Sequence, residues 1–313
     1  MAKTRALKRR IRSVENTRKI TRTMEMVATS KMKRAQDRVV SARPYAQALA
    51  AAIADLMNPE LAERFPLLRQ PVPPAAGGPK QAAVILITSN RGLAGAFNAN
   101  LIRMARQRIA DLQESGHEVE LHGVGKKGIK FFQFVGRKLA VARIDIGDRP
   151  TAAHAQELVA PLMADYEAGR LASVDVVYAN FKSALSTPPA VMRVLPVEAE
   201  GPGDRGTGGQ KGARSSSRPP VPPSPRPAYY ILKPSADAIL GALLPLYVKN
   251  MVYRALVETA ASEQGARRTA MKNATDNAGE MLDILRRTYN RARQAQITQE
   301  LAEIVGGAEA LKG

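Results

Sequence analysis

The sequence feature that most constrains the fold is the distribution of proline. All 21 prolines lie between residues 44 and 245, so 1–43 and 246–313 contain none. Because proline removes a backbone hydrogen-bond donor and breaks helix interiors, long proline-free stretches permit very long helices. We therefore expect one long helix at each end of the chain, over 1–57 and 236–313.

Both end stretches carry an apolar stripe with the spacing of a coiled-coil seam, interrupted in the first stretch by Arg18 and Glu25. Neither stripe is wide enough to be buried alone, so we expect the two helices to pair. A domain separates them in the sequence, which makes an antiparallel shaft the natural arrangement. Helices of roughly 80 and 100 Å would extend well beyond a compact domain. The stripes consist of Leu7, Ile11, Val14, Thr21, Ala28, Met32, Ala35 and Val39, and of Leu240, Leu244, Tyr247, Met251, Leu256, Ala260, Met271, Ala274, Ala278, Met281, Leu285, Ala292, Ile297, Leu301 and Ile304.

Three residues mark the limits of the second helix. Pro245 stands near its start and should kink it or occupy its first turn. Gly306 and Gly307 follow the last residues of the stripe, and glycine is the usual residue just beyond a helix C-terminus. We therefore expect the helix to end near residue 305.

Residues 80–197 alternate strand and helix signals. AAVILIT, EVELHGVG and SVDVVYANF read as strands, and Phe97 to about Ser115 reads as an amphipathic helix. Such alternation is typical of a small α/β sheet with helical crossovers. The expected fold class is α/β plus a long antiparallel coiled coil, with a central Rossmann-like α/β domain over 80–197 and a shaft formed by the N- and C-terminal helices.

A segment over 198–228 has a different composition. Seven Pro and six Gly fall within residues 199–227, and large apolar residues are almost absent. Such a segment cannot bury a core, so we interpret it as a disordered Pro/Gly-rich insertion.

The stretch SNRGLAGAF follows the first predicted strand and resembles the start of a phosphate-binding site. A dinucleotide site requires G-x-G-x-x-G and an acidic residue at the end of the second strand. Here the glycines are spaced G-x-x-G, the second strand ends in Gly123-Val124-Gly125, and no G-x-x-x-x-G-K-[ST] loop occurs. A tight turn and close helix–sheet packing explain the glycines, so we expect no cofactor.

Composition excludes several kinds of site. The chain has no Cys, so it has no disulfide, thiolate metal site or thiol nucleophile. His117, His122 and His154 lack metal-ligand spacing, and we expect each to lie at the surface or at a strand edge. No apolar run reaches the roughly 18 residues needed to span a bilayer. We expect no metal site.

Charge is concentrated in the first 43 residues, where 14 Lys and Arg stand against three acidic residues. This basic arm requires an acidic partner, which could be nucleic acid, anionic lipid or an acidic protein surface. A leucine-zipper DNA reader would carry a compact basic region beside its zipper. Here the basic residues, among them Lys8, Arg9 and Arg10, interleave with the seam, which favours an acidic protein. The C-terminal stretch is dense in small and amide residues, which suits either a wet helix face or contacts with other proteins.

Together these stretches resemble one family. TRKITRTMEMVATSKMKRAQ, ITSNRGLAGAFNANL, SEQGARRTAMKNATDNA and YNRARQAQITQELAEIVGGAEAL are similar to the gamma subunits of F-type ATP synthase, in order and over almost the whole chain apart from 199–227. The resemblance implies a non-catalytic central rotor shaft, present in one copy per complex, inside a hexamer of alternating alpha and beta subunits. The α/β domain would meet the epsilon subunit and the c-ring, and the c-ring would be its only link to the membrane. The lack of organelle signals favours the cytoplasmic side of a bacterial inner membrane.

The resemblance also implies which residues contact the stator. They are Met24 on the N-terminal helix and Arg267, Arg293, Gln294, Thr298 and Glu300 on the C-terminal helix. We further predict that Lys8, Arg9 and Arg10 face acidic segments of beta.

Two departures from the family pattern stand out. Asn90 occupies a position where the family usually has Asp, which argues against an ionic role for that turn. The insertion lacks Cys, so it cannot be a redox switch, and we interpret it as a dispensable tether or a modest steric regulator. The positive charge leaves a coiled-coil nucleic-acid-binding scaffold as the alternative function. A nicotinamide-type enzyme, with its cofactor bound by residues 80–197, is a third possibility.

Overall fold

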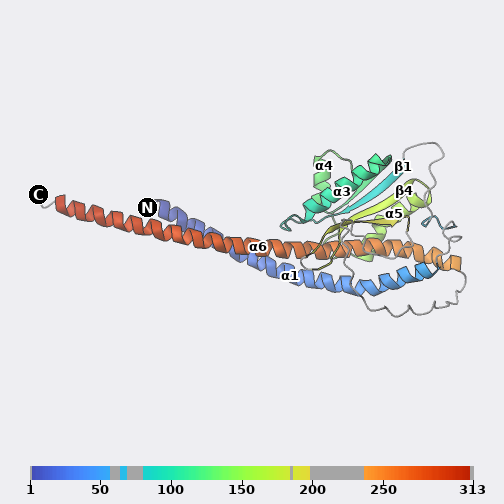
Figure 1. Cartoon of the computed structure of the whole chain (residues 1–313), viewed down its shortest axis with the longest axis horizontal. Helices are drawn as coiled ribbons and strands as arrows, with labels where there is room; N and C mark the ends of the chain where they lie inside the picture. Colours follow the sequence, from blue (N-terminus) through green and yellow to red (C-terminus); the bar gives the residue numbers. More distant parts are fainter. Residues whose placement is uncertain (1, 57–63, 69–79, 184–185, 198–235, 311–313) are drawn as a thin grey trace, which may run out of the picture. The chain divides into compact units, whose positions relative to one another are not determined.

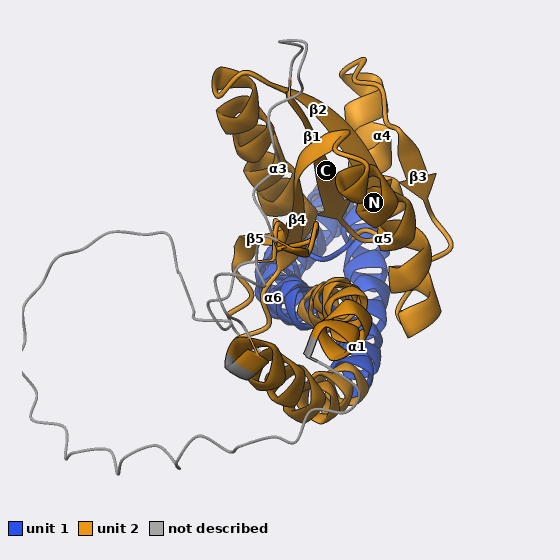
Figure 2. Ribbon diagram, turned by 90° about the vertical axis from the view of Figure 1, so that its right-hand side faces the viewer, with its two compact units in different colours: residues 1–32, 93–95, 264–313 blue, residues 33–92, 96–263 orange. Residues whose placement is uncertain are grey.

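A computed structural model describes residues 2–56, 64–68, 80–183, 186–197 and 236–310. The predicted insertion over 198–228 lies outside the described residues. The chain divides into two compact units (Figure 2). Unit 1 contains residues 1–32, 93–95 and 264–313, and unit 2 contains residues 33–92 and 96–263.

The two ends of the chain form the long helices that the proline distribution predicts. Helix α1 spans Ala2–Leu56 and helix α6 spans Ala236–Ala310 (Figure 1). Pro44 lies inside α1 and Pro245 inside α6. Pro245 is therefore not a first-turn residue. Each helix contributes residues to both units, so the predicted domain limits of 1–57, 80–197 and 236–313 remain predictions.

The predicted end of the second helix near residue 305 is wrong. Gly306 and Gly307 continue α6, which ends at Ala310. Glycine lowers helix stability by about 1 kcal/mol but does not forbid the helical conformation. Glycine commonly ends a helix by adopting the left-handed region with its capping bonds. These two glycines remain helical instead.

Unit 2 contains a five-stranded sheet with the order β3-β2-β1-β4-β5. Adjacent strands are parallel except for the antiparallel pair β4–β5. Three helices connect the parallel strands. The elements are β1 (Lys80–Ile87), α3 (Phe97–Glu114), β2 (His117–Val124), α4 (Lys126–Phe134), β3 (Val141–Arg143), α5 (Ala152–Glu167), β4 (Leu171–Ala179) and β5 (Pro189–Leu195).

Helices cover both faces of this sheet (Figure 1). Helices α3 and α4 lie on one face. Helix α5 packs on the other, where its buried Leu158 and Leu162 share a core with Leu49 of α1 and Val248 of α6. The two positions follow from right-handed crossovers. Through α3 and α4 the chain moves from β1 to β2 and then to β3, whereas through α5 it returns from β3 to β4, so α5 lies on the opposite face. The predicted fold class, an α/β domain with paired end helices, is confirmed.

Candidate functional site

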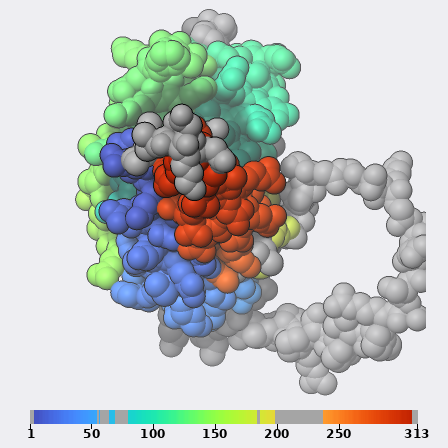
Figure 3. All heavy atoms as spheres, turned by 90° about the vertical axis from the view of Figure 1, so that its left-hand side faces the viewer, coloured from blue at the N-terminus to red at the C-terminus, as the bar shows by residue number. Residues whose placement is uncertain are grey.

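Within unit 1 the two end helices lie side by side, and Figure 3 views them end-on. Thr4 Oγ1 lies 3.1 Å from Gln296 Oε1. Arg286 Nη2 donates to Glu15 Oε1 at 2.7 Å. Further along, Thr275 Oγ1 donates to Thr21 Oγ1 at 2.8 Å. As the residue number rises on α1 it falls on α6, so the helices are antiparallel.

The buried seam of this pair is made of small and flexible side chains. On α1 it follows the predicted stripe. On α6 it departs from it, because Met281 is 53% exposed whereas its neighbour Leu282 is only 1% exposed. The buried seam residues of unit 1 are Thr21, Ala28 and Met32 on α1 and Met271, Ala278 and Leu282 on α6.

The cause of this departure is an ambiguity in the heptad pattern. Residues 271, 278, 285 and 292 give one core position, and the second can follow by three residues or by four. The step of three gives Met281, whereas the step of four gives Thr275, Leu282 and Gln296. The contacts of Thr275 and Gln296 with α1 show that the step of four is the one adopted. The predicted seam residues Ile297, Leu301 and Ile304 are exposed, because α6 continues there past Gln296, which is paired with Thr4 near the start of α1.

The six predicted stator contacts are spread along unit 1. Met24 is half-buried and Arg267 is buried at 7% exposure. Arg293, Gln294, Thr298 and Glu300 are exposed on the C-terminal part of α6. Thr298 Oγ1 donates to the Gln294 carbonyl and Glu300 accepts from Gln296 Nε2, so both contacts stay within the helix. The structure therefore does not gather the six into one cluster.

The predicted basic arm lies beside part of this set. Lys8, Arg9 and Arg10 are exposed on α1 between Thr4 and Glu15. Their neighbours across the pair are the α6 residues between the partners of these two, that is 286–296. This stretch includes Arg293 and Gln294. The arm, Arg293 and Gln294 thus belong to one level of unit 1, which carries many positive charges.

Sequence reasoning did not identify the apolar residues that unit 1 leaves exposed. Isolated exposed apolar side chains need no explanation, but several on one helical pair indicate a surface that another molecule covers. The sequence gives a partial signal for them, because the predicted apolar stripe of α6 includes several of these residues. They are Ile20, Met26 and Val27 on α1 and Met281, Ile284, Ile297, Leu301, Ile304 and Val305 on α6, each at least 46% exposed.

A groove of about 610 Å³ opens between the helices of unit 1. Side chains of both signs line it, and two of these are the residues that interrupt the predicted seam, Arg18 and Glu25. Arg18 is exposed and Glu25 half-buried. The interruption of the seam therefore opens a polar groove. Its other charged residues are Arg22, Lys272, Asp276 and Asp283.

The residues that follow β1 occupy the backbone donors at the start of α4. Helix N-termini bind phosphate through free backbone N–H groups. At the start of α4, the N–H groups of Lys126, Lys127 and Gly128 donate to Asn90 Oδ1, to the Ser89 carbonyl and to Thr88 Oγ1, at 3.0, 3.1 and 2.9 Å. All three donors are already used by residues that follow β1.

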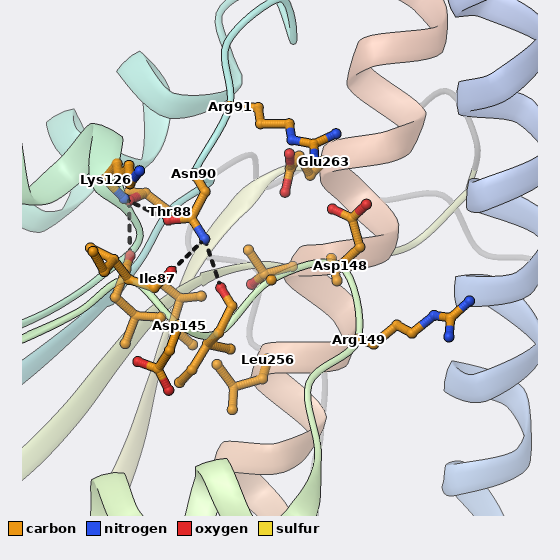
Figure 4. A pocket seen from close by; sticks show the side chains of 16 residues that line it. Ile87, Thr88, Asn90, Arg91, Lys126, Asp145, Asp148, Arg149, Leu256 and Glu263 are labelled. Atoms are coloured by element: carbon orange, nitrogen blue, oxygen red, sulfur yellow. Dashed lines mark hydrogen bonds between the residues drawn. The ribbon is translucent and has the colours of Figure 1, made fainter.

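Asn90 organises the carboxyl edge of the sheet (Figure 4). Its Nδ2 donates to the carbonyls of Ile144 and Ile146 at 2.9 and 3.0 Å, while its Oδ1 accepts from Lys126. A carboxylate could not donate the first two bonds. Asn90 therefore has a neutral bridging role.

Beside Asn90 lies a cavity of about 510 Å³ within unit 2. Hydrogen bonds from Arg143 lower the pKa of the Asp145 carboxyl at its rim to about 2. Figure 4 shows Arg91 and Glu263 extending toward one another. The charged lining has both signs, with Arg91, Lys126 and Arg149 against Asp145, Asp148 and Glu263.

The histidines are structural. His154 takes part in a capping box with Thr151 at the start of α5. His117 Nδ1 lies 3.3 Å from the Leu112 carbonyl. The expected surface or edge position is wrong for His122, which is 5% exposed on β2 between β1 and β3. In the part of the chain that the structure describes, no three or more His, Asp or Glu side chains are grouped to hold a metal ion. No described helix is long and apolar enough to cross a membrane.

Comparison with known proteins assigns the chain to a family. A family model described as ATP synthase matches residues 3–311. The ATP synthase gamma chain of Gemmatimonas aurantiaca is 58% identical over 313 residues, which is all of both chains. That of Moorella thermoacetica is 44% identical over 312 residues, with the same coverage. A chain in the cryo-EM structure of Euglena gracilis mitochondrial ATP synthase has a TM-score of 0.64 at 19% identity, over 99% of this chain and 95% of that one, which shows the same fold.

These findings first identify the chain as a subunit of an ATP synthase. The chain belongs to the family of ATP synthase gamma chains. The relatives named give no support to a nucleic-acid-binding scaffold.

Proposed function

We propose that this chain is the central rotor stalk of an F-type ATP synthase. It couples ion flow through a membrane c-ring to ATP synthesis or hydrolysis at a hexamer of alternating alpha and beta subunits. The observation that carries this proposal is the antiparallel helix pair of unit 1, with its exposed apolar side chains. Such a surface needs a surrounding partner.

The composition of the helix pair suits a rotating contact. A two-helix coil resists bending, and it can transmit a turning force. Large buried anchors would hold the shaft in one position, because interface energy concentrates in such residues. Beside its exposed apolar residues, unit 1 presents many small, amide and charged side chains, including Gln294, Thr298 and Glu300. Contacts of this kind can form and break at modest cost.

The remaining partners follow from the same assignment. The sheet-bearing unit would meet the epsilon subunit and the c-ring, one copy of the chain would serve each complex, and the c-ring would be its only link to the membrane. Its place would be the cytoplasmic side of a bacterial inner membrane. Met24 and Arg267 would contact the stator together with the exposed residues of α6.

The test replaces Lys8, Arg9 and Arg10 by Gln in the assembled complex. If the arm faces acidic segments of beta, ATP-driven proton pumping should fall several-fold while nucleotide binding changes little. The matched control replaces Arg106, Lys130 and Lys138, three exposed basic residues of unit 2, by Gln. Equal losses of pumping and of nucleotide binding would count against the arm's role. Failure of the unsubstituted chain to co-purify with alpha and beta would refute the function itself.

A further inference from the structure

The segment Ala255–Glu263 of α6 is buried on every side. None of its nine residues is more than 8% exposed. A helix in such surroundings is normally apolar, yet Glu258, Thr259, Ser262 and Glu263 are polar. Buried polar groups require hydrogen-bond partners, so the arrangement of these side chains carries information about what the segment does.

Three of these side chains reach the backbone at the end of β4. The Ala179 N–H donates to Thr259 Oγ1 at 3.2 Å, and Ser262 Oγ donates to the Ala179 carbonyl at 3.2 Å. The Phe181 N–H donates to Glu258 Oε2 at 3.4 Å. One turn of α6 therefore satisfies three backbone groups where the sheet strand ends.

The carboxylate of Glu258 is itself held in place. Arg254, one turn earlier on α6, donates from Nε to Glu258 Oε1 at 2.7 Å. This charge-assisted bond orients the second oxygen toward Phe181. Glu258 is 1% exposed, and Arg254 gives this buried side chain a partner of opposite charge.

Apolar contacts close the remaining sides of the segment. Val257 and Ala261 share a cluster with Ala35 and Val39 of α1. Leu256 and Ala260 line the cavity beside residues 144–149. Arg38 Nη1 donates to the Asp148 carbonyl at 3.3 Å, which ties α1 to the same loop. All of these residues belong to unit 2.

Packing and hydrogen bonds act differently on a helix held in this way. Apolar contacts are non-directional, so a ring of Ala and Val side chains tolerates small rotations of the helix. The three hydrogen bonds are directional. A shift of one residue would rotate the helix by about 100° and would leave the Ala179 and Phe181 backbone groups buried and unpaired.

We propose that Glu258, Thr259 and Ser262 form a torsional lock that fixes α6 to the end of β4. This rests on the proposed rotor function, because a turning force applied to the sheet must reach α6 before it can reach the part of the same helix in unit 1. The three are positioning residues. They hold the helix at one angle and touch no nucleotide.

The test measures the angular stiffness of the rotor in the assembled complex. The chain contains no Cys, so Gln133→Cys at the exposed end of α4 gives a single attachment point for a bead. The alpha–beta hexamer is fixed to a surface and stalled with a non-hydrolysable nucleotide, and the angular fluctuation of the bead is recorded. The variant is Thr259→Val with Ser262→Ala. The control is Thr269→Val, because the Thr269 hydroxyl donates only to the Gly265 carbonyl of its own helix.

Loss of two of the three directional bonds should raise the angular variance about twofold or more over the control. Proton pumping should then fall more than ATP hydrolysis. If the double variant does not assemble, Ser262→Ala alone should give a smaller rise. Variance equal to that of the control in an assembled complex would overturn the lock. If the bead on the otherwise unsubstituted complex does not turn with ATP, the rotor function fails instead.

Discussion

The buried carboxylate of Asp175 on β4 allows a sharp test of what holds unit 2 together. Its side chain is 1% exposed. Oδ2 accepts from Nε and Nη2 of Arg108 on α3 at 2.9 and 2.8 Å. Oδ1 accepts from Nε of Arg193 on β5 at 3.2 Å. One carboxylate therefore joins a helix, a central strand and an edge strand.

Asp175→Asn should strongly destabilise unit 2. Removing one partner of a buried ion pair costs about 3–5 kcal/mol when the remaining charge stays buried. The side chains of Arg108 and Arg193 are 23% and 39% exposed, so water compensates in part. We therefore expect a loss of about 2–4 kcal/mol in the free energy of unfolding. Replacing all three residues by apolar ones, with Arg108→Met, Asp175→Leu and Arg193→Met, should restore stability to within about 1 kcal/mol of the original.

The assay is urea unfolding of the full chain, read by hydrogen exchange of the peptides that cover β4 and β5. This readout isolates the part of unit 2 that contains the three residues. A loss below about 1 kcal/mol for Asp175→Asn would refute the reasoning, because it would mean that the carboxylate contributes no more than an exposed pair. An apolar triple variant as unstable as the single variant would also contradict it.

Three further predictions follow from the remaining features. Asn90→Asp should lower the free energy of unfolding by about 2–3 kcal/mol, measured by thermal unfolding of the full chain, because two hydrogen-bond donors are lost and a carboxylate then faces two carbonyl oxygens. The control is Asn100→Asp at a half-buried position of α3, which should change stability little. Burial lowers the pKa of His122 against the opposing influence of Glu120 and Asp165, so the unfolded chain binds the proton more readily than the folded chain. The free energy of unfolding should therefore keep its full contribution from His122 above about pH 6.5 and decrease below it. His122→Gln should flatten this decrease in urea titrations, and an unchanged slope would contradict the assignment. Deleting 201–225 should leave proton-coupled ATP synthesis in membrane vesicles largely intact, and its complete loss would refute dispensability.

The parts of the fold that sequence predicted best are those governed by local rules. Proline placement gives the two long helices, and alternating strand and helix patterns give the sheet with its crossovers. The α1 seam could also be predicted, since Ala28, Met32 and Val39 offer only one continuous apolar line. In each case the signal lies within a few residues of the structure it determines.

The features that sequence could not predict depend on distant partners. The choice between Met281 and Leu282 depends on which face meets α1, and both satisfy a heptad. The role of Asn90 rests on carbonyls 54 and 56 residues away. His122 reads as a polar strand residue, and only the order of the strands places it inside the sheet. None of these outcomes has a local signature.

A single helix, α6, combines two requirements that favour opposite side chains. Where it passes the end of β4 it must be held firmly, and there buried polar side chains such as Glu258 and Ser262 make directional bonds to backbone. Toward its C-terminus the proposed rotor function requires contacts that form and break, and there Gln294 and Thr298 are exposed. Because the surroundings change along the helix, a stripe drawn from end to end assigns some residues to the wrong face. Under the proposed function, the polar residues of α6 divide by burial into those that fix the helix and those that allow movement against a partner, and this division follows from hydrogen-bond directionality rather than from composition.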